Sequence, residues 1–171
     1  YMVYAVGVGG FFASQFHLLS HAIFKAMLFL AAGAVIHALG TRDIREMGGI
    51  GRRMPFTGAA FLIGALALAG IPPVNGFWSK EFILEGGLAH GPWWAYGIML
   101  LGAGLTALYT LRVFWLVFMG EPRSERPAHK AGSFMRVSLA LLAAGTLVSW
   151  LLAGPFGRLL TATLPFHEVH A

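Results

Sequence analysis

The chain has 171 residues, of which 57% are hydrophobic and only 11% are charged. Its mean hydropathy of +0.71 is typical of an integral membrane protein and excludes an ordinary soluble domain. The absence of cysteine excludes disulfides, iron–sulfur ligation and thiolate metal sites within this chain. The net charge of +5 does not indicate nucleic-acid binding, because the basic residues lie in short links between apolar segments.

Four apolar segments are long enough to cross a hydrocarbon core of about 30 Å, which needs roughly 20 helical residues. They predict an all-α integral membrane protein with a single membrane domain. Residues 1–9 carry no charge and no cleavage pattern, so we interpret them as the end of an earlier helix rather than a signal peptide. We therefore expect a part of a longer subunit. The predicted spans are residues 11–39, 56–89, 93–119 and 137–153.

The second segment is too long for one straight span, because roughly 34 helical residues would extend about 51 Å. Pro72 and Pro73 remove backbone donors and Gly76 adds conformational freedom, so we expect a helix break near residues 70–76. Irregular backbone within a membrane must face protein or a water-filled cavity. The sequence therefore predicts a discontinuous helix with a cavity beside its break.

The charges of the links predict the orientation. Arginine and lysine are concentrated in residues 41–55 and 120–136, whereas the link near His90 has neither. Two crossings separate the basic links, so both lie on one side, which the positive-inside rule makes cytoplasmic. The link 120–136 is then cytoplasmic and the tail 154–171 lies on the opposite side.

Lys80 follows the predicted break and has apolar sequence on both sides. A lysine within hydrocarbon costs roughly 3 kcal/mol on insertion scales, which makes it a candidate functional residue. Transporters place ion sites at broken spans of this kind. The alternative is a lysine that only anchors a helix end by extending toward the membrane surface.

His17, His21 and Lys25 are spaced four residues apart in the first span. Each step advances about 40° beyond a full turn, so all three share one helical stripe, with Ser14 close to it. Such a row of titratable groups is typical of a proton pathway, although histidines can also simply bond neighbouring helices. Zinc is disfavoured, because a third ligand and the glutamate of a metalloprotease motif are missing near by, and we expect no metal site.

Two further charged residues could support this site. Glu81 points about 100° away from Lys80 on a helix, where it could pair with a neighbouring helix or complement the positive end of the second half-helix. Arg112 lies in the third span, and it is structural if its side chain extends toward the cytoplasmic face.

Several stretches resemble the antiporter-like membrane subunits of respiratory complex I, the proton-pumping NADH:quinone oxidoreductase. The resemblance extends from Tyr1 to about Arg123 and more loosely to about Ala153. It is closest to the subunit L type, of which the chain would be the C-terminal part only. The stretches that carry it are His17–Leu30, Arg45–Ile50, Gly70–Leu84, Leu105–Arg112 and Phe118–Arg123.

The resemblance implies a role for each candidate residue. Lys80 would end the exit half of a proton channel, His17 and His21 would connect it to a central lysine on an earlier helix, and Lys25 would extend this axis. The chain itself would bind no cofactor, whereas FMN, iron–sulfur clusters and quinone are expected in partner subunits. The expected partners are other membrane subunits, especially the neighbouring antiporter-like subunit, and the lipid bilayer of the inner (plasma) membrane.

Similar subunits occur in membrane-bound hydrogenases and as the large A subunit of multisubunit sodium/proton antiporters. Lys80-Glu81, where subunit L usually has Lys-Asp, leans toward the antiporter, whereas residues 120–123 lean toward subunit L. A third interpretation is a non-conducting structural fragment. The sequence alone leaves the coupling ion, proton or sodium, open.

Overall fold

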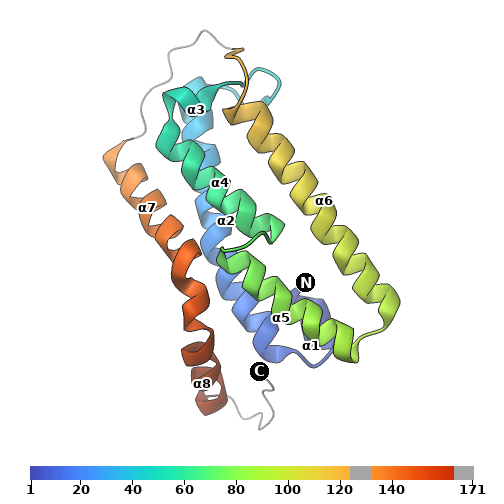
Figure 1. The fold of residues 1–171 in the computed structure, drawn as a ribbon. Coiled ribbons are helices and arrows are strands. Elements are labelled where there is room, and N and C mark those ends of the chain that lie inside the picture. Colours follow the sequence, from blue (N-terminus) through green and yellow to red (C-terminus); the bar gives the residue numbers. More distant parts are fainter. Residues whose placement is uncertain (124–131, 164–171) are drawn as a thin grey trace.

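The computed structural model describes residues 1–123 and 132–163, and every regular element in these ranges is a helix (Figure 1). This confirms the predicted all-α fold. In chain order the elements are α1 (Met2–Gly7), α2 (Phe11–Leu39), α3 (Ile50–Arg53), α4 (Pro55–Ala69), α5 (Asn75–His90), α6 (Trp93–Phe118), α7 (Ser133–Val148), the 3-10 helix η1 (Ser149–Leu152) and α8 (Ala153–Thr163).

Three helical segments in the described ranges are long and apolar enough to cross a membrane, and α4 is a shorter apolar helix. The first is α2 and the second is α6, which lie where the sequence predicts spans. The third runs over Ser133–Thr163, beyond both ends of the predicted span 137–153. It continues past Ala153 because Pro155 lies in the first turn of α8, where a proline is tolerated.

The interruption between α4 and α5 confirms the predicted discontinuity near residues 70–76 (Figure 1). Helix α4 ends at Ala69 and is followed by Gly70, whose φ of 79° lies in the left-handed region that favours glycine. Pro72 and Pro73 follow and are joined by a cis peptide bond. Gly76, however, lies within the first turn of α5, where a Cβ would collide with the carbonyl oxygen of Ala67. Its role is therefore close backbone approach between the half-helices rather than added freedom.

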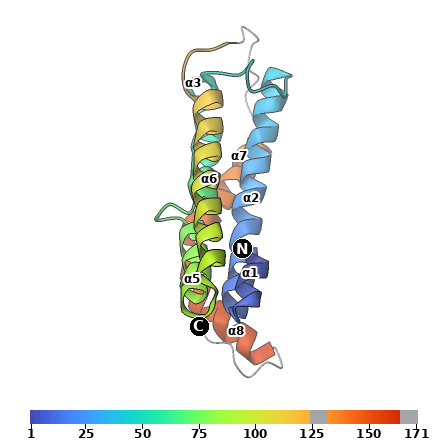
Figure 2. The ribbon, with the colours of Figure 1, turned by 90° about the vertical axis from the view of Figure 1, so that its right-hand side faces the viewer.

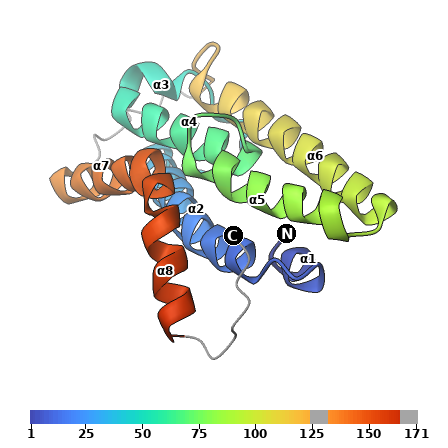
Figure 3. The same cartoon turned by 60° about the horizontal axis from the view of Figure 1, so that its bottom comes forward.

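Helix α2 contacts α1, α4, α5 and α7, while α6 packs against α4 and α5. Figure 2 shows α2 and α6 as two long helices that run in much the same direction along the bundle. Figure 3 shows α6 and α7 on opposite sides of this unit. The α2–α4 contact is tight, because a Cβ at Gly64 would lie 2.8 Å from Cγ of Leu28. Small residues that allow such close approach are the usual basis of helix packing in membranes.

The two basic links meet at one end of the bundle. The backbone N–H of Gly49 donates to the carbonyl of Met119 at 3.0 Å, which places the link after α2 beside the link after α6. This arrangement agrees with the prediction that two crossings separate the basic links, so that both lie on one side. Residues 124–131 of the predicted cytoplasmic link and 164–171 of the predicted tail lie outside the described residues.

Candidate functional site

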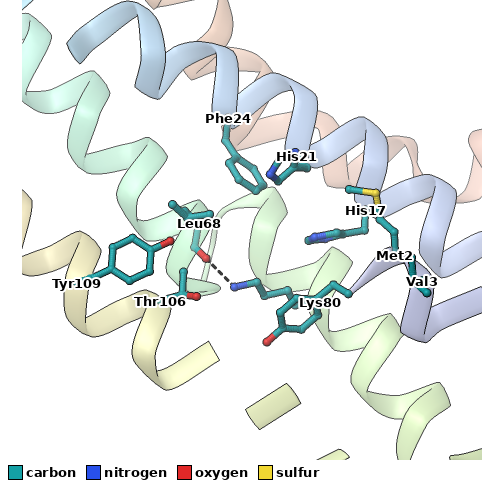
Figure 4. A pocket seen from close by; sticks show the side chains of 10 residues that line it. Met2, Val3, His17, His21, Phe24, Leu68, Lys80, Thr106 and Tyr109 are labelled. Atoms are coloured by element: carbon teal, nitrogen blue, oxygen red, sulfur yellow. Dashed lines mark hydrogen bonds between the residues drawn. The ribbon is translucent and has the colours of Figure 1, made fainter. Parts of the chain in front are cut away.

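The break between α4 and α5 borders a cavity of about 330 Å³ (Figure 4). Tyr1 and residues of α1, α2, α4, α5 and α6 line it, so its wall is built from five helices of the bundle. It brings together three of the predicted site residues from two helices. The polar residues in its wall are Tyr1, His17, His21, Lys80, Thr106 and Tyr109.

Lys80 turns its side chain toward the break and is only 6% exposed. Its Nζ donates to the carbonyl oxygen of Leu68 at 2.6 Å, one of the last carbonyls of α4, which lack helical donors because the helix ends there. The amine also lies 5.1 Å from the ring centre of Tyr1. The amine is therefore surrounded by electron-rich groups, a carbonyl oxygen and the face of an aromatic ring.

His17 reaches from α2 to α5 and is buried, at 4% exposure. Its Nδ1 lies 2.9 Å from Oγ of Ser79, the residue that precedes Lys80 on α5. The imidazole is also 5.8 Å from the Tyr1 ring, measured between ring centres. Neighbouring residues of α5 therefore provide the contact to His17 and the amine in the cavity.

The stripe on α2 continues from His17 to His21, and their ring centres are 6.1 Å apart. Lys25 lies one turn further and lines a second cavity of about 190 Å³, with Nζ 5.6 Å from the ring centre of Phe29. Leu68 and Tyr109 belong to the walls of both cavities. The stripe thus spans two adjacent cavities instead of one.

The other predicted residues do not line the first cavity. Ser14 is buried on α2, about one turn before His17. Glu81 is exposed on α5 and Arg112 is exposed on α6. Pro72 and Pro73 of the break are exposed as well.

Sequence reasoning missed Ser79 and the residues that α1 and α6 contribute. Thr106 and Tyr109 lie in the Leu105–Arg112 stretch that carries the family resemblance, which was the available signal. Ser79 adjoins Lys80, so its position could have been noticed. The carbonyl of Leu68 could not be found in this way, because a backbone acceptor becomes available only where the helix ends.

These features define an integral membrane protein that buries ionisable side chains at a broken helix. The chain belongs to the NADH:quinone oxidoreductase/Mrp antiporter transmembrane family, whose model matches residues 1–106. The resemblance to antiporter-like subunits is therefore confirmed. The predicted location, within the inner (plasma) membrane, agrees with the apolar helices and with this family.

Curated relatives include subunit L proteins from two kinds of complex. The F(420)H(2) dehydrogenase subunit L of Methanosarcina mazei is 44% identical over 149 residues, which cover 81% of this chain and 22% of that protein. The NADH-quinone oxidoreductase subunit L of Rickettsia bellii is 46% identical over 154 residues, which cover 87% of this chain and 24% of that protein. The chain thus spans about a quarter of the length of the curated relatives it matches.

Solved structures of three membrane complexes contain a similar chain, each 27% identical to this one. The archaeal membrane-bound sulfane sulfur reductase matches with a TM-score of 0.81 over 87% of this chain and 26% of that chain. The Mrp complex of a Dietzia species matches with 0.74 over 87% and 35%. Respiratory complex I from Thermus thermophilus matches with 0.74 over 90% and 35%.

Proposed function

We propose that the chain is part of a proton-translocating membrane subunit of an NADH:quinone oxidoreductase and carries the exit half of its proton path. The observation that carries this proposal is the shared cavity of His17, His21 and Lys80 beside the helix break. Relatives named as NADH-quinone oxidoreductase subunit L support the choice of complex. The subunit itself would have no redox site.

The proposed path runs along the polar wall of the cavity. A proton from a central lysine elsewhere in the subunit would reach His21, pass to His17 and then to Lys80. The ring centres of the two histidines are 6.1 Å apart, so waters would complete the hydrogen-bonded path. The cavity has polar side chains in its wall and is large enough to hold waters. Lys80 would release the proton to the non-cytoplasmic side, against about 2.3 kcal/mol per charge for each 100 mV.

The partners of this subunit are part of the proposal. Electron transfer would occur in subunits that hold FMN, iron–sulfur clusters and quinone, and this chain would bind none of them. Its large exposed apolar side chains, such as Leu101, Leu105 and Leu108 on α6, are suited to contact with lipid or with neighbouring membrane helices. A neighbouring antiporter-like subunit is the expected protein partner. The similar chains in three multisubunit membrane complexes support this expectation.

The second candidate is the large A-type subunit of a sodium/proton antiporter without a redox partner. It is favoured by the Mrp complex, whose similar chain has the same TM-score as that of complex I. An equivalent subunit of a membrane-bound hydrogenase or related respiratory complex fits the same fold, as the sulfane sulfur reductase indicates. These candidates differ in the energy source and not in the cavity.

Proton movement in inverted vesicles tests the proposal. Vesicles from cells that carry the full-length gene are energised with NADH, and the wild type is compared with Lys80→Met. Weaker pumping in the variant, with NADH oxidation retained, supports the complex and the role of Lys80 together. Glu85→Gln is a matched control, because Glu85 is exposed on the same helix.

Two outcomes contradict the proposal. Unchanged pumping in Lys80→Met refutes the role of Lys80. Proton movement that responds to a sodium gradient but not to NADH establishes the antiporter instead.

A further inference from the structure

The hydroxyl of Ser79 contacts two groups inside the bundle. Its Oγ lies 2.9 Å from Nδ1 of His17 and 3.3 Å from the carbonyl oxygen of Gly76. Ser79 is fully buried, at 0% exposure, and His17 is nearly so. The hydroxyl has one hydrogen, so it can be the donor in only one of these two contacts.

The carbonyl of Gly76 has no hydrogen, so it can only accept. If the Ser79 hydroxyl donates to this carbonyl, its oxygen can only accept from the imidazole. Both contacts are then hydrogen bonds only when Nδ1 of His17 carries a proton. The opposite arrangement, with Ser79 donating to Nδ1, gives up the bond to Gly76.

The surroundings of the other imidazole nitrogen favour the same assignment. His17 lines the cavity with the Lys80 amine, and Figure 4 shows its ring reaching toward the space between His21 and Lys80. A charged amine attracts a lone pair and repels an N–H group. With Nδ1 bonded to Ser79, the lone pair on Nε2 is the group available to the cavity.

We infer that Ser79 is a positioning residue that holds the resting proton of His17 on Nδ1, so that Nε2 alone exchanges protons with the cavity. This inference deepens the proposed function and rests on it. It differs from a relay through both ring nitrogens. The Nδ1 side leads only to the Ser79 hydroxyl and then to the Gly76 carbonyl, which cannot pass a proton on.

The proton balance of the step is simple. Nε2 binds one proton arriving from the His21 side, and the resulting imidazolium keeps its Nδ1–H bond to Ser79. Once the Lys80 amine has released its previous proton and is neutral, the same proton passes from Nε2 to Lys80, which restores the starting tautomer of His17. Since Nδ1 never loses its proton, the ring does not have to rotate or exchange tautomers between cycles. The proton enters and leaves His17 through the same cavity.

The tautomer can be measured directly by ¹⁵N NMR of the full-length subunit in its complex, with labelled histidine and His17 assigned by difference from His17→Gln. We expect neutral His17 to carry its proton on Nδ1 in the wild type. Ser79→Ala removes the acceptor and should shift the tautomer ratio about fivefold toward Nε2–H. This is the change in an equilibrium ratio that the loss of one ordinary hydrogen bond produces. Ser79→Thr keeps a hydroxyl and should keep the wild-type tautomer.

Ser20→Ala is the matched control. Ser20 is buried on α2 near His17, and its Oγ has no hydrogen-bond partner in the part of the chain that the structure describes. The same Ser-to-Ala change there should leave the His17 spectrum and pumping unchanged. In Ser79→Ala, protons pumped per NADH should fall, and Ser79→Thr should restore them.

The outcomes separate this inference from the proposed function. A wild-type His17 with its neutral proton on Nε2 overturns the tautomer assignment, whether or not Ser79 variants assemble. An unchanged tautomer in Ser79→Ala overturns the role of Ser79. Normal pumping in His17→Gln refutes the proton path itself, and that result does not depend on the tautomer.

Discussion

The side-chain amide of Asn75 donates to Oγ of Ser149 at 2.9 Å, and this bond joins the start of α5 to the start of η1. Asn75 is the first residue of α5 after the α4–α5 break, and Ser149 is the first residue of η1, where α7 gives way to a 3-10 turn. Beside it, the rings of Trp78 and Trp150 stack with their centres 5.3 Å apart. The start of α5, just after the break, is thus braced against η1.

Replacing Asn75 by alanine should loosen this brace. Ser149 is buried and would lose its donor, which costs about 1 kcal/mol for a hydrogen bond inside a membrane protein. We expect a lower thermal unfolding temperature of the detergent-purified complex. Ser20→Ala removes a buried hydroxyl that has no partner among the described residues and should change it little. Equal unfolding temperatures for Asn75→Ala and the wild type would show that the bond contributes no net stability.

The α4–α5 break could be predicted from sequence, but the 3-10 helix η1 that contacts the start of α5 could not. Pro72 and Pro73 act locally, because a missing N–H and a ring clash end a helix wherever they occur. Ser149–Leu152 contains no proline or glycine and is compatible with an ordinary α-helix. Its 3-10 geometry accompanies contacts with Asn75 and Trp78, which are more than 70 positions away in the sequence.

In the candidate site, too, the spacing within one helix predicts some relationships, whereas contacts between helices decide the others. The four-residue spacing correctly placed His17 and His21 on one face, because helical periodicity alone decides that relationship. The same spacing grouped Lys25 with them, yet Lys25 lines the adjacent cavity. The boundary between the cavities is set by Leu68 and Tyr109 of other helices, so no pattern within α2 could reveal it.

Lys80→Arg separates proton transfer from a fixed positive charge. An arginine stays protonated under all ordinary conditions, so it can donate to the Leu68 carbonyl but cannot release a proton. We expect NADH oxidation to continue while coupled proton pumping falls as strongly as in Lys80→Met. Pumping and oxidation measured on the same vesicles give this ratio directly. Wild-type pumping in Lys80→Arg would mean that Lys80 supplies only charge.

Lys25→Met should impair pumping less than Lys80→Met. Lys25 lies outside the cavity that holds His17, His21 and Lys80, and it is only partly buried. Its removal would change the potential at His21 without removing a member of the proposed path. The initial rates of NADH-driven pumping of the two variants provide the comparison. A loss equal to that of Lys80→Met would place Lys25 on the path itself.

Gly76→Ala should prevent the two half-helices from packing. The added Cβ would collide with the backbone carbonyl of Ala67, and a backbone atom cannot move aside as a flexible side chain does. Overpacking of this kind costs about 3 kcal/mol or more, so the variant should accumulate poorly in the membrane.

Gly86→Ala is the matched control on the same helix, because nothing lies within 4 Å of a Cβ there. That change should stabilise α5 by about 0.5–1 kcal/mol through its higher helix propensity. Quantitative blots of membranes and the unfolding temperatures of the purified complexes measure both effects. Equal accumulation of the two variants would show that α4 and α5 do not meet backbone to backbone at this position.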